Sequence, residues 1–211
     1  MYIKLDTIKA ILKEYNIEIT GALHVGAHNC EELNVYSGLG LKGSDIIWVD
    51  AINKKVLEAK EKGIENVYNA IITDKDDNDV AFNVANHMQS SSVLELGTHL
   101  KAHPAVKYVS KILGKTITVD TFLKRNAIDG SKLNLWNFDI QGAELMALKG
   151  AIENIKYVDA LFLEVNEREL YKKCGLIGEV DSFLENYNFK RIKTHMTRWG
   201  WGDALYIKVK K

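Results

Sequence analysis

Two acidic side chains stand at the ends of apolar runs, where a parallel sheet would present them to a ligand. The run 133–139 ends in Asp139, and the run 158–165 carries Glu164 next to its last residue. The carboxyl ends of parallel strands meet at one edge of a sheet, so both carboxylates are expected to face one crevice. A carboxylate in such a crevice can take the proton of a bound hydroxyl group. Asp139 is therefore the expected catalytic base, with Glu164 as its catalytic partner.

A glycine and another aspartate mark a second candidate site near the start of the chain. The apolar run 21–26 ends in Gly26 and the run 45–50 ends in Asp50. A glycine at a strand-to-helix junction lets a ligand approach the main chain, and an acid at the next strand end can accept ribose hydroxyls. Because the other glycines of G-x-G-x-x-G are absent, the pattern favours S-adenosylmethionine over a dinucleotide. Gly26 as a plain turn residue and Asp50 as a helix cap fit the pair equally well.

Three further groups have weaker claims to a function. Asp139 and Glu164 can hold Mg²⁺ through oxygen ligands. A metal-free site is favoured, because these are only two obvious ligands and His195 is an uncertain third. His195, Trp199 and Trp201 stand between the last two expected strands, where an aromatic face suits stacking on a sugar ring. We expect Trp199 to contact the substrate and Trp201 to pack in the core.

The elements that would position these side chains alternate between helix and strand. Apolar residues at helical spacing follow Asp6, which is expected to cap a helix, and Asp120 is expected to cap another. Strands are expected at 21–26, 45–50, 66–73, 116–119, 133–139 and 158–165, with a final antiparallel pair at 189–194 and 204–209. This order is typical of a doubly wound sheet. We therefore expect an α/β fold that is Rossmann-like, with a seven-stranded, mostly parallel sheet and a terminal antiparallel strand.

The length of 211 residues corresponds to one domain, or at most one and a half. We expect a single domain over 1–211, with a helical extension at 1–19 and an irregular insertion at 74–115. A structureless stretch of that length inside a compact domain is often functional. His99 and His103 lie within it, and the interpretation favoured for both is that of surface histidines.

The composition limits the function classes. Hydrophobic residues make up 46% and charged residues 27%, which is typical of a globular domain rather than a disordered one. Lys+Arg and Asp+Glu both number 28, so the net charge gives no support for nucleic-acid binding. Two cysteines suit a reducing compartment, and a cytoplasmic location is expected. No apolar run approaches the roughly 18 residues of a membrane span.

The motifs taken together are similar to those of one protein family. They are His24-Val-Gly-Ala-His-Asn-Cys-Glu-Glu-Leu33, the long run from Phe138-Asp-Ile-Gln-Gly-Ala-Glu-Leu to Ala151, and Leu161-Phe-Leu-Glu-Val165. The chain resembles the FkbM-type S-adenosylmethionine-dependent methyltransferases from about Thr20 to Val209. The resemblance implies a class I methyltransferase fold. It also implies transfer of a methyl group to a hydroxyl, often on a sugar, a glycan or a natural product.

The family pattern also implies a set of contacts. The expected cofactor contacts are Val25, Gly26, Ala27, His28, Asp50, Ala51, Asn69, Ala70, Ile71, Asp139 and Gln141. The expected substrate contacts are Ser91 together with His195 and Trp199 of the loop between the last two strands. The first motif departs from the family, because the common Asp-x-Gly-Ala-Asn is His24-Val-Gly-Ala-His28 here. An acid at this place often holds the amino group of the methionine moiety. Glu31 or Glu32 is expected to compensate.

The predicted function is that of an O-methyltransferase that uses S-adenosylmethionine and acts on a hydroxyl of a sugar or glycan. The acceptor would be a carbohydrate: a sugar, a glycan or a nucleotide-sugar. A non-catalytic adenosine-ligand-binding or scaffold domain remains an alternative. So does a methyltransferase acting on a natural product or a nucleic acid, although the zero net charge makes a nucleic acid unfavoured. The sequence does not indicate the oligomeric state.

Overall fold

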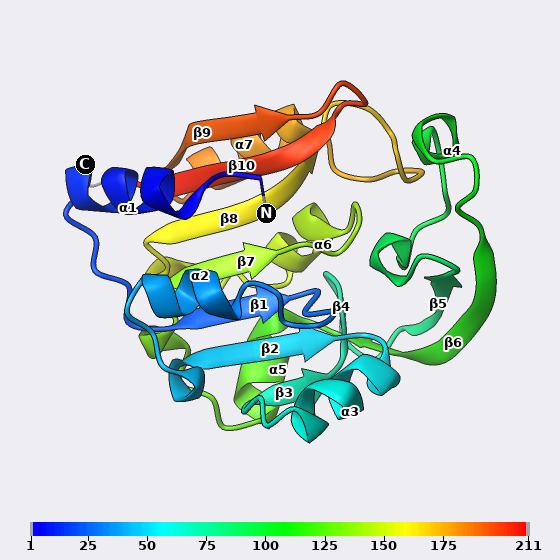
Figure 1. Ribbon diagram of the computed structural model, residues 1–211, viewed down its shortest axis with the longest axis horizontal. Coiled ribbons are helices and arrows are strands. Elements are labelled where there is room, and N and C mark those ends of the chain that lie inside the picture. The colour runs from blue at the N-terminus through cyan, green and yellow to red at the C-terminus, as the bar shows by residue number, and fades with distance from the viewer. Residues whose placement is uncertain (1, 210–211) are drawn as a thin grey trace.

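A seven-stranded sheet forms the centre of the computed structural model, which describes residues 2–209. The strand order is β3-β2-β1-β7-β8-β10-β9 (Figure 1). Six strands are parallel to one another, and β10 is antiparallel to both of its neighbours. The strands are β1 Ala22–Val25, β2 Ile46–Asp50, β3 Val67–Asn69, β7 Leu135–Phe138, β8 Ala160–Asn166, β9 Phe189–Met196 and β10 Trp201–Lys208. The Rossmann-like, mostly parallel sheet expected from the sequence is confirmed.

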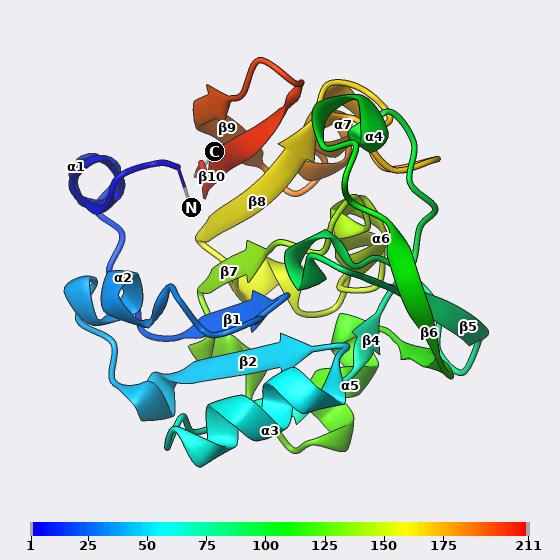
Figure 2. The ribbon, with the colours of Figure 1, turned by 45° about the vertical axis from the view of Figure 1, so that its right-hand side comes forward.

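Helices cover both faces of this sheet (Figures 1 and 2). One layer contains α1 Leu5–Glu14, α2 Leu33–Gly38 and α3 Asn53–Glu61, and the other contains α5 Val119–Arg125, α6 Glu144–Lys149 and α7 Ile177–Glu185. Every residue of β1, β2, β7 and β8 is consequently buried, which explains their nearly continuous apolar sequences. Within residues 2–209 no helix has the length and apolar content that crossing a bilayer requires.

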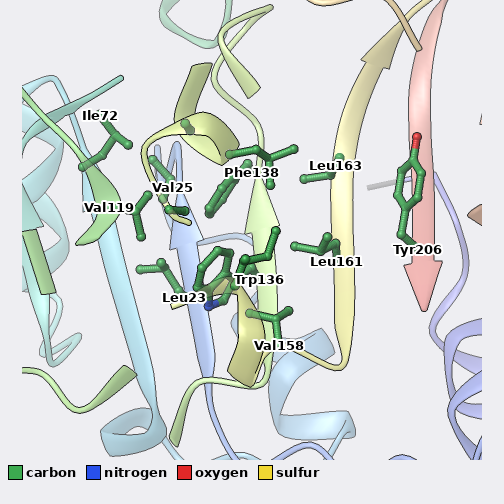
Figure 3. Packing of buried hydrophobic residues seen from close by; sticks show 14 of the residues in the cluster. Leu23, Val25, Ile72, Val119, Trp136, Phe138, Val158, Leu161, Leu163 and Tyr206 are labelled. Carbon is green, nitrogen blue, oxygen red and sulfur yellow. The ribbon is translucent and has the colours of Figure 1, made fainter. Parts of the chain in front are cut away.

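The packing between the strands and the α5–α7 layer fixes the strand register. Leu23 pairs with Trp136, and Val25 pairs with Phe138 on the neighbouring strand. Figure 3 shows these four side chains on the same face, together with Leu161 of β8. Complete burial of such a side chain contributes about 1.5–3 kcal/mol, and a slip of one residue would turn each one to the opposite face. The positions of the strand ends, and of the polar residues at them, follow from this register.

A second, three-stranded sheet has the order β4-β6-β5. Its strands are β4 Ile71–Ile72, β5 Asp79–Ala85 and β6 Tyr108–Ile117. The expectation of an irregular segment at 74–115 is corrected: residues 79–85 and 108–115 belong to a long antiparallel pair, whereas 74–78 and 86–107 contain no named strand. The strand expected at 66–73 is likewise divided, because β3 joins the main sheet and β4 the small one. Leu113, on β6, is 82% exposed, so this strand lacks the buried apolar face that alternation would reveal.

Two helix caps also differ from the expectation. Lys4 is the N-cap residue of α1, and Asp6 lies in the first turn, where its charge still favours the helix dipole. Thr118 caps α5 by accepting a hydrogen bond from the main-chain N–H of Thr121 at 3.1 Å. The carboxylate of Asp120 instead accepts main-chain N–H groups of the loop after α6, which ties that loop to α5.

Candidate active site

The carboxyl ends of β1, β2, β7 and β8 open into one cavity of about 560 Å³. A volume of this size is typical of a small-molecule site. The segment 86–107, which includes α4 His99–Ala102, lies beyond these strand ends (Figure 2). Residues from this segment, from the loop after β8 and from the N-terminal stretch complete the lining. The cavity is therefore where an open α/β sheet is expected to bind its ligand.

Most of the side chains expected at the site line this cavity. They are Val25, Gly26, His28, Asp50, Ala51, Ala70, Ile71, Ser91, Asp139, Gln141 and Glu164. Ala27 and Asn69 do not line it: Ala27 is buried, and the Asn69 amide donates a hydrogen bond to the main-chain carbonyl of Asp50 at 2.9 Å. His195 and Trp199 also lie outside the lining, whereas Trp201, expected in the core, is part of it. Trp199 packs beside the guanidinium of Arg198, at 4.8 Å from the ring centroid.

The turn after β1 is shaped by the neighbouring strand. Gly26 has φ +96°, and a Cβ atom built on it would lie 1.9 Å from the main-chain oxygen of Asp139. The N–H groups of Gly26 and Ala27 both donate to the carbonyl of Val49, at 2.9 and 3.0 Å. The glycine is thus required by the close approach of β7, whether or not a ligand is bound. It holds the ends of β1, β2 and β7 together at the floor of the cavity.

Asp50, at the end of β2, also stabilises the floor of the cavity through hydrogen bonds. One carboxylate oxygen accepts the main-chain N–H of His28, and the other accepts that of Ile52 at the start of α3, both at 2.7 Å. Burial raises the pKa of Asp50. Each oxygen keeps a second acceptor position, because a carboxylate oxygen has two lone-pair directions. Asp50 therefore combines both roles considered from the sequence: it caps main-chain groups and remains at the wall of the cavity.

The two histidines of the first motif have different environments. The Nδ1 atom of His24 lies 2.8 Å from the hydroxyl of Tyr36, which also accepts the Asn137 amide at 2.9 Å. Burial lowers the pKa of His24 to about 4, so its ring is neutral and belongs to a buried polar network. His28, in contrast, lines the cavity and has its Nδ1 atom 2.8 Å from Glu31. Glu31 and Glu32 both line the cavity, and their compensating role stays a prediction.

Asp139 and Glu164 are held together by the side-chain amide of Gln141. Its Nε2 atom donates to Asp139 at 2.7 Å and to Glu164 at 2.9 Å. Its Oε1 atom accepts the Tyr171 hydroxyl at 2.8 Å, which fixes the orientation of the amide. Gln141 has φ +57°, a left-handed conformation that costs a residue with a side chain free energy. The hydrogen bonds of the Gln141 amide hold the main chain in this conformation and keep the amide between the two carboxylates.

The two members of the pair differ in exposure. Asp139 is exposed in the cavity, whereas Glu164 is 6% exposed. Burial and the adjacent charge of Asp139 raise the pKa of Glu164 well above its ordinary value. The raised pKa favours the protonated form of Glu164, which can donate a hydrogen bond to Asp139. Asp139 is left as the accessible carboxylate of the pair.

Several residues of the cavity have no counterpart among the sequence expectations. Asp203 of β10 stands opposite Glu164 in the register, and its carboxylate accepts the main-chain N–H of Tyr2. The Tyr2 ring stacks on His195 at 5.3 Å and meets Trp201 edge-on at 5.4 Å. Tyr2, Trp201 and Asp203 all line the cavity. A lone aspartate before the apolar run 204–209 was a usable signal, but nothing in the sequence places Tyr2 beside it.

The carboxylate pair also bears on the question of a metal ion. In residues 2–209 no group of three or more His, Cys, Asp or Glu side chains is arranged to hold one. The amide nitrogen of Gln141 lies between Asp139 and Glu164, in the place a shared cation would need. The metal-free site favoured from the sequence stays a prediction.

We expect Glu164→Gln to make the protein more stable than the wild type, by an amount that grows with pH. The folded wild type keeps a proton on Glu164 that the unfolded chain releases above its ordinary pKa. The proton on Glu164 stabilises the folded state fully below that ordinary pKa. This stabilisation is lost as pH rises toward the raised pKa of the folded state. Glutamine donates to Asp139 and accepts from Gln141 without taking up a proton. Urea unfolding at pH 5, 7 and 9 measures the difference, and parallel pH curves would contradict the shared proton.

The strand order and the cavity at the carboxyl edge define an α/β protein of the Rossmann-like class that binds a small ligand. The family model of the methyltransferase FkbM domain matches residues 24–191, and the chain belongs to this family. The match includes the end of β1 with its glycine turn, Asp50, and the β7 and β8 ends that carry the carboxylate pair. The chain is therefore a methyltransferase by family, which agrees with the expected cofactor, S-adenosylmethionine.

Solved structures similar to this chain include other methyltransferases. A SAM-dependent methyltransferase from Aquifex aeolicus is 15% identical, with a TM-score of 0.43, over 95% of this chain and 89% of that one. Magnesium protoporphyrin IX methyltransferase from Synechocystis with bound SAM is 12% identical, with a TM-score of 0.42, over 97% and 78%. TrmK from M. capricolum, in complex with S-adenosyl-homocysteine, is 9% identical, with a TM-score of 0.46, over 100% and 70%. No curated protein sequence matches the chain.

Proposed function

We propose that the protein transfers the methyl group of S-adenosylmethionine to a hydroxyl group of a sugar or glycan. The observation that carries the proposal is the Asp139–Glu164 pair, which shares a cavity with the aromatic rings of Tyr2 and Trp201. A base is needed to remove the proton of a sugar hydroxyl, and an aromatic face can stack on the sugar ring. The cavity offers both.

The chain's own residues suit the proposed cofactor. An apolar wall made by Ile52, Ile71 and Phe82 is available to an adenine ring, and Asp50 remains free to accept ribose hydroxyls. Glu31 and Glu32 also line the cavity. These carboxylates favour a cationic ligand, and S-adenosylmethionine carries both a sulfonium and an ammonium group. When bound, it supplies an electrophilic methyl group that is already activated.

Asp139 acts on the hydroxyl of the acceptor. Its exposed carboxylate takes the hydroxyl proton as the oxygen forms a bond to the methyl carbon, while the carbon–sulfur bond breaks and sulfur keeps the electron pair. Glu164, which holds its own proton, donates a hydrogen bond to Asp139 and leaves this carboxylate charged until the transfer. Gln141 holds both groups in place and keeps Asp139 at the open side of the pair. The proposal uses no metal ion.

The test is mass spectrometry of candidate glycans after incubation with the protein and S-adenosylmethionine, with and without EDTA. Methylation of a glycan hydroxyl that persists in EDTA is the expected result. Methylation only of carboxyl, amine or nucleobase groups would overturn the sugar acceptor. Activity that vanishes in EDTA and returns with Mg²⁺ would make Asp139 and Glu164 ligands of a cation. Cofactor binding with no transfer to any acceptor would favour the non-catalytic alternative.

We expect Asp50→Ala to weaken the binding of S-adenosylhomocysteine by roughly 1–3 kcal/mol, the range for a lost buried hydrogen-bond partner. Calorimetry measures the affinity, and thermal melting shows whether the variant is folded. The matched control is Asp45→Ala at the opposite end of β2, where the carboxylate also accepts a main-chain N–H, that of Lys42, at 2.8 Å. The two variants remove the same kind of cap, so equal loss of affinity would contradict the ribose role. Tight NAD binding without any response to S-adenosylmethionine would contradict the cofactor itself.

A further inference from the structure

Three histidines from the segment 86–107 line the cavity beyond the strand ends. His87 precedes the 3₁₀ turn Met88–Ser90, His99 begins α4, and His103 follows this helix. The ring centroids of His99 and His103 are 5.0 Å apart, and those of His99 and Tyr171 are 5.3 Å apart. The methyl-transfer mechanism proposed above uses none of the three rings.

None of the three imidazole rings forms a hydrogen bond with another residue in the range 2–209. His99 is only 5% exposed, and its Nδ1 atom is buried without a partner. A buried polar atom left unpaired costs about 1–3 kcal/mol. Such an atom in a native structure calls for an explanation, and a ligand that enters the cavity would supply the missing partner.

The surroundings of His99 indicate the charge of that ligand. Burial, followed by the neighbouring rings of His103 and His87, lowers the pKa of His99 to about 4, and no carboxylate offsets this effect. The carboxylates of the cavity instead belong to the strand ends and to the turn after β1: Glu31, Glu32, Asp50, Asp139, Glu164 and Asp203. The cavity therefore has an acidic part, suited to a cationic cofactor, and a histidine part. An oxyanion suits three imidazoles that line one cavity, because each ring has an N–H that it can donate to an oxygen of the ligand.

We infer that His87, His99 and His103 bind an oxyanionic group, a phosphate or a carboxylate, on the molecule that accepts the methyl group. The inference rests on the proposed transfer to a sugar and narrows the acceptor to an acidic sugar. Its anionic group would occupy the histidine part of the cavity, and a hydroxyl of the same molecule would reach Asp139. Three donors match the three terminal oxygens of a phosphate, whereas a carboxylate engages two of them.

The test is a titration of the protein, in the presence of S-adenosylhomocysteine, with three sugars that share one ring: glucose 6-phosphate, glucuronate and glucose. The imidazole proton resonances report on binding. We expect both acidic sugars to shift the resonances of the three histidines, and glucose to leave them unchanged. The tighter of the two acidic sugars identifies the phosphate or the carboxylate. Equal shifts with glucose, or no shift with either acidic sugar, would overturn the inference.

Variants separate the histidines from general charge attraction. His99→Gln and the exposed His103→Gln are each expected to weaken acidic-sugar binding about tenfold, as expected for the loss of one charge-assisted hydrogen bond. The second variant keeps the test valid if the buried one does not fold. Lys101→Gln is the matched control: it removes a full charge from α4 at an exposed residue that does not line the cavity. If Lys101→Gln weakened binding as much as His103→Gln, the histidine site would be refuted.

The same sugars distinguish a failure of this inference from a failure of the proposed function. Suppose that a neutral glycan is methylated and that neither acidic sugar shifts the histidine resonances. The sugar O-methyltransferase would then be retained and the oxyanion site refuted. Shifts that depend on His99 and His103, without methylation of any sugar, would retain the oxyanion site and refute the sugar as acceptor.

Discussion

Asp139→Asn is expected to lower kcat for methyl transfer by about 100-fold or more, the lower range for removal of a general base. Asparagine keeps the size of the side chain and still accepts the amide of Gln141, so the cavity keeps its shape. The affinity for S-adenosylhomocysteine should change little, because this ligand has no sulfonium charge for Asp139 to attract. Single-turnover rates and calorimetry measure the two quantities. A near-normal kcat would show that the base lies elsewhere.

Two further measurements make this prediction specific. The pKa of Glu164 should fall in Asp139→Asn, because the charge of Asp139 is one of the causes that raise it. Infrared titration of the buried carboxyl group detects this without any acceptor. Glu164→Gln is the matched control, since glutamine still donates a hydrogen bond to Asp139. It should lose much less activity than Asp139→Asn, and an equal loss would place the transferred proton on Glu164.

The central sheet could be predicted because the physics that forms it is local and strong. Strands buried on both faces have nearly continuous apolar sequences, and β1, β2, β7 and β8 all end close to the residues expected. Gly26, Asp50, Asp139 and Glu164 lie at or next to the ends of these runs, so locating the strands also locates the site residues. The register of a parallel sheet then brings them to one edge without further information.

The rest of the site depends on contacts that are distant in sequence. Gln141 joins Asp139 to Glu164 only because its main chain adopts a left-handed conformation, and no glycine or asparagine at this position announces it. Tyr2 reaches Asp203 across 201 residues. The partners of His24, which are Tyr36 and Asn137, likewise come from a helix and a strand that only the complete fold brings together.

The small sheet shows a different limit. The sequence of β6 contains Lys111 and Lys115, and its Leu113 is largely exposed, so neither alternation nor a continuous apolar run reveals the strand. Pairing with β5 supplies its stability instead, and a single sequence does not display pairing. The β5–β6 pair has a consequence for the site, because it fixes both ends of the segment that carries His87, His99 and His103.

Gly26→Ala is the second substitution with a large expected effect, and Gly40→Ala is its matched control. Both glycines have positive φ, +96° and +95°, so alanine is strained at either position by about 1–3 kcal/mol. The space around them differs. A Cβ atom at Gly40 meets nothing within 4 Å, whereas at Gly26 it lies 1.9 Å from the main-chain oxygen of Asp139.

The clash at Gly26 can be removed only by moving the main chain. The colliding atom is main chain, and the N–H of Asp139 is bonded to the carbonyl of Val25 at 3.0 Å, so β7 moves only if the pairing of β1 with β7 breaks. We therefore expect Gly26→Ala to lower the free energy of unfolding by at least about 2 kcal/mol more than Gly40→Ala, as in overpacked cores. Urea unfolding measures both variants. Folded Gly40→Ala beside unfolded Gly26→Ala agrees with the prediction, whereas equal destabilisation would mean that the floor of the cavity yields to a methyl group. That floor carries Asp139, so the same result would also weaken the argument that the fold holds the base rigidly.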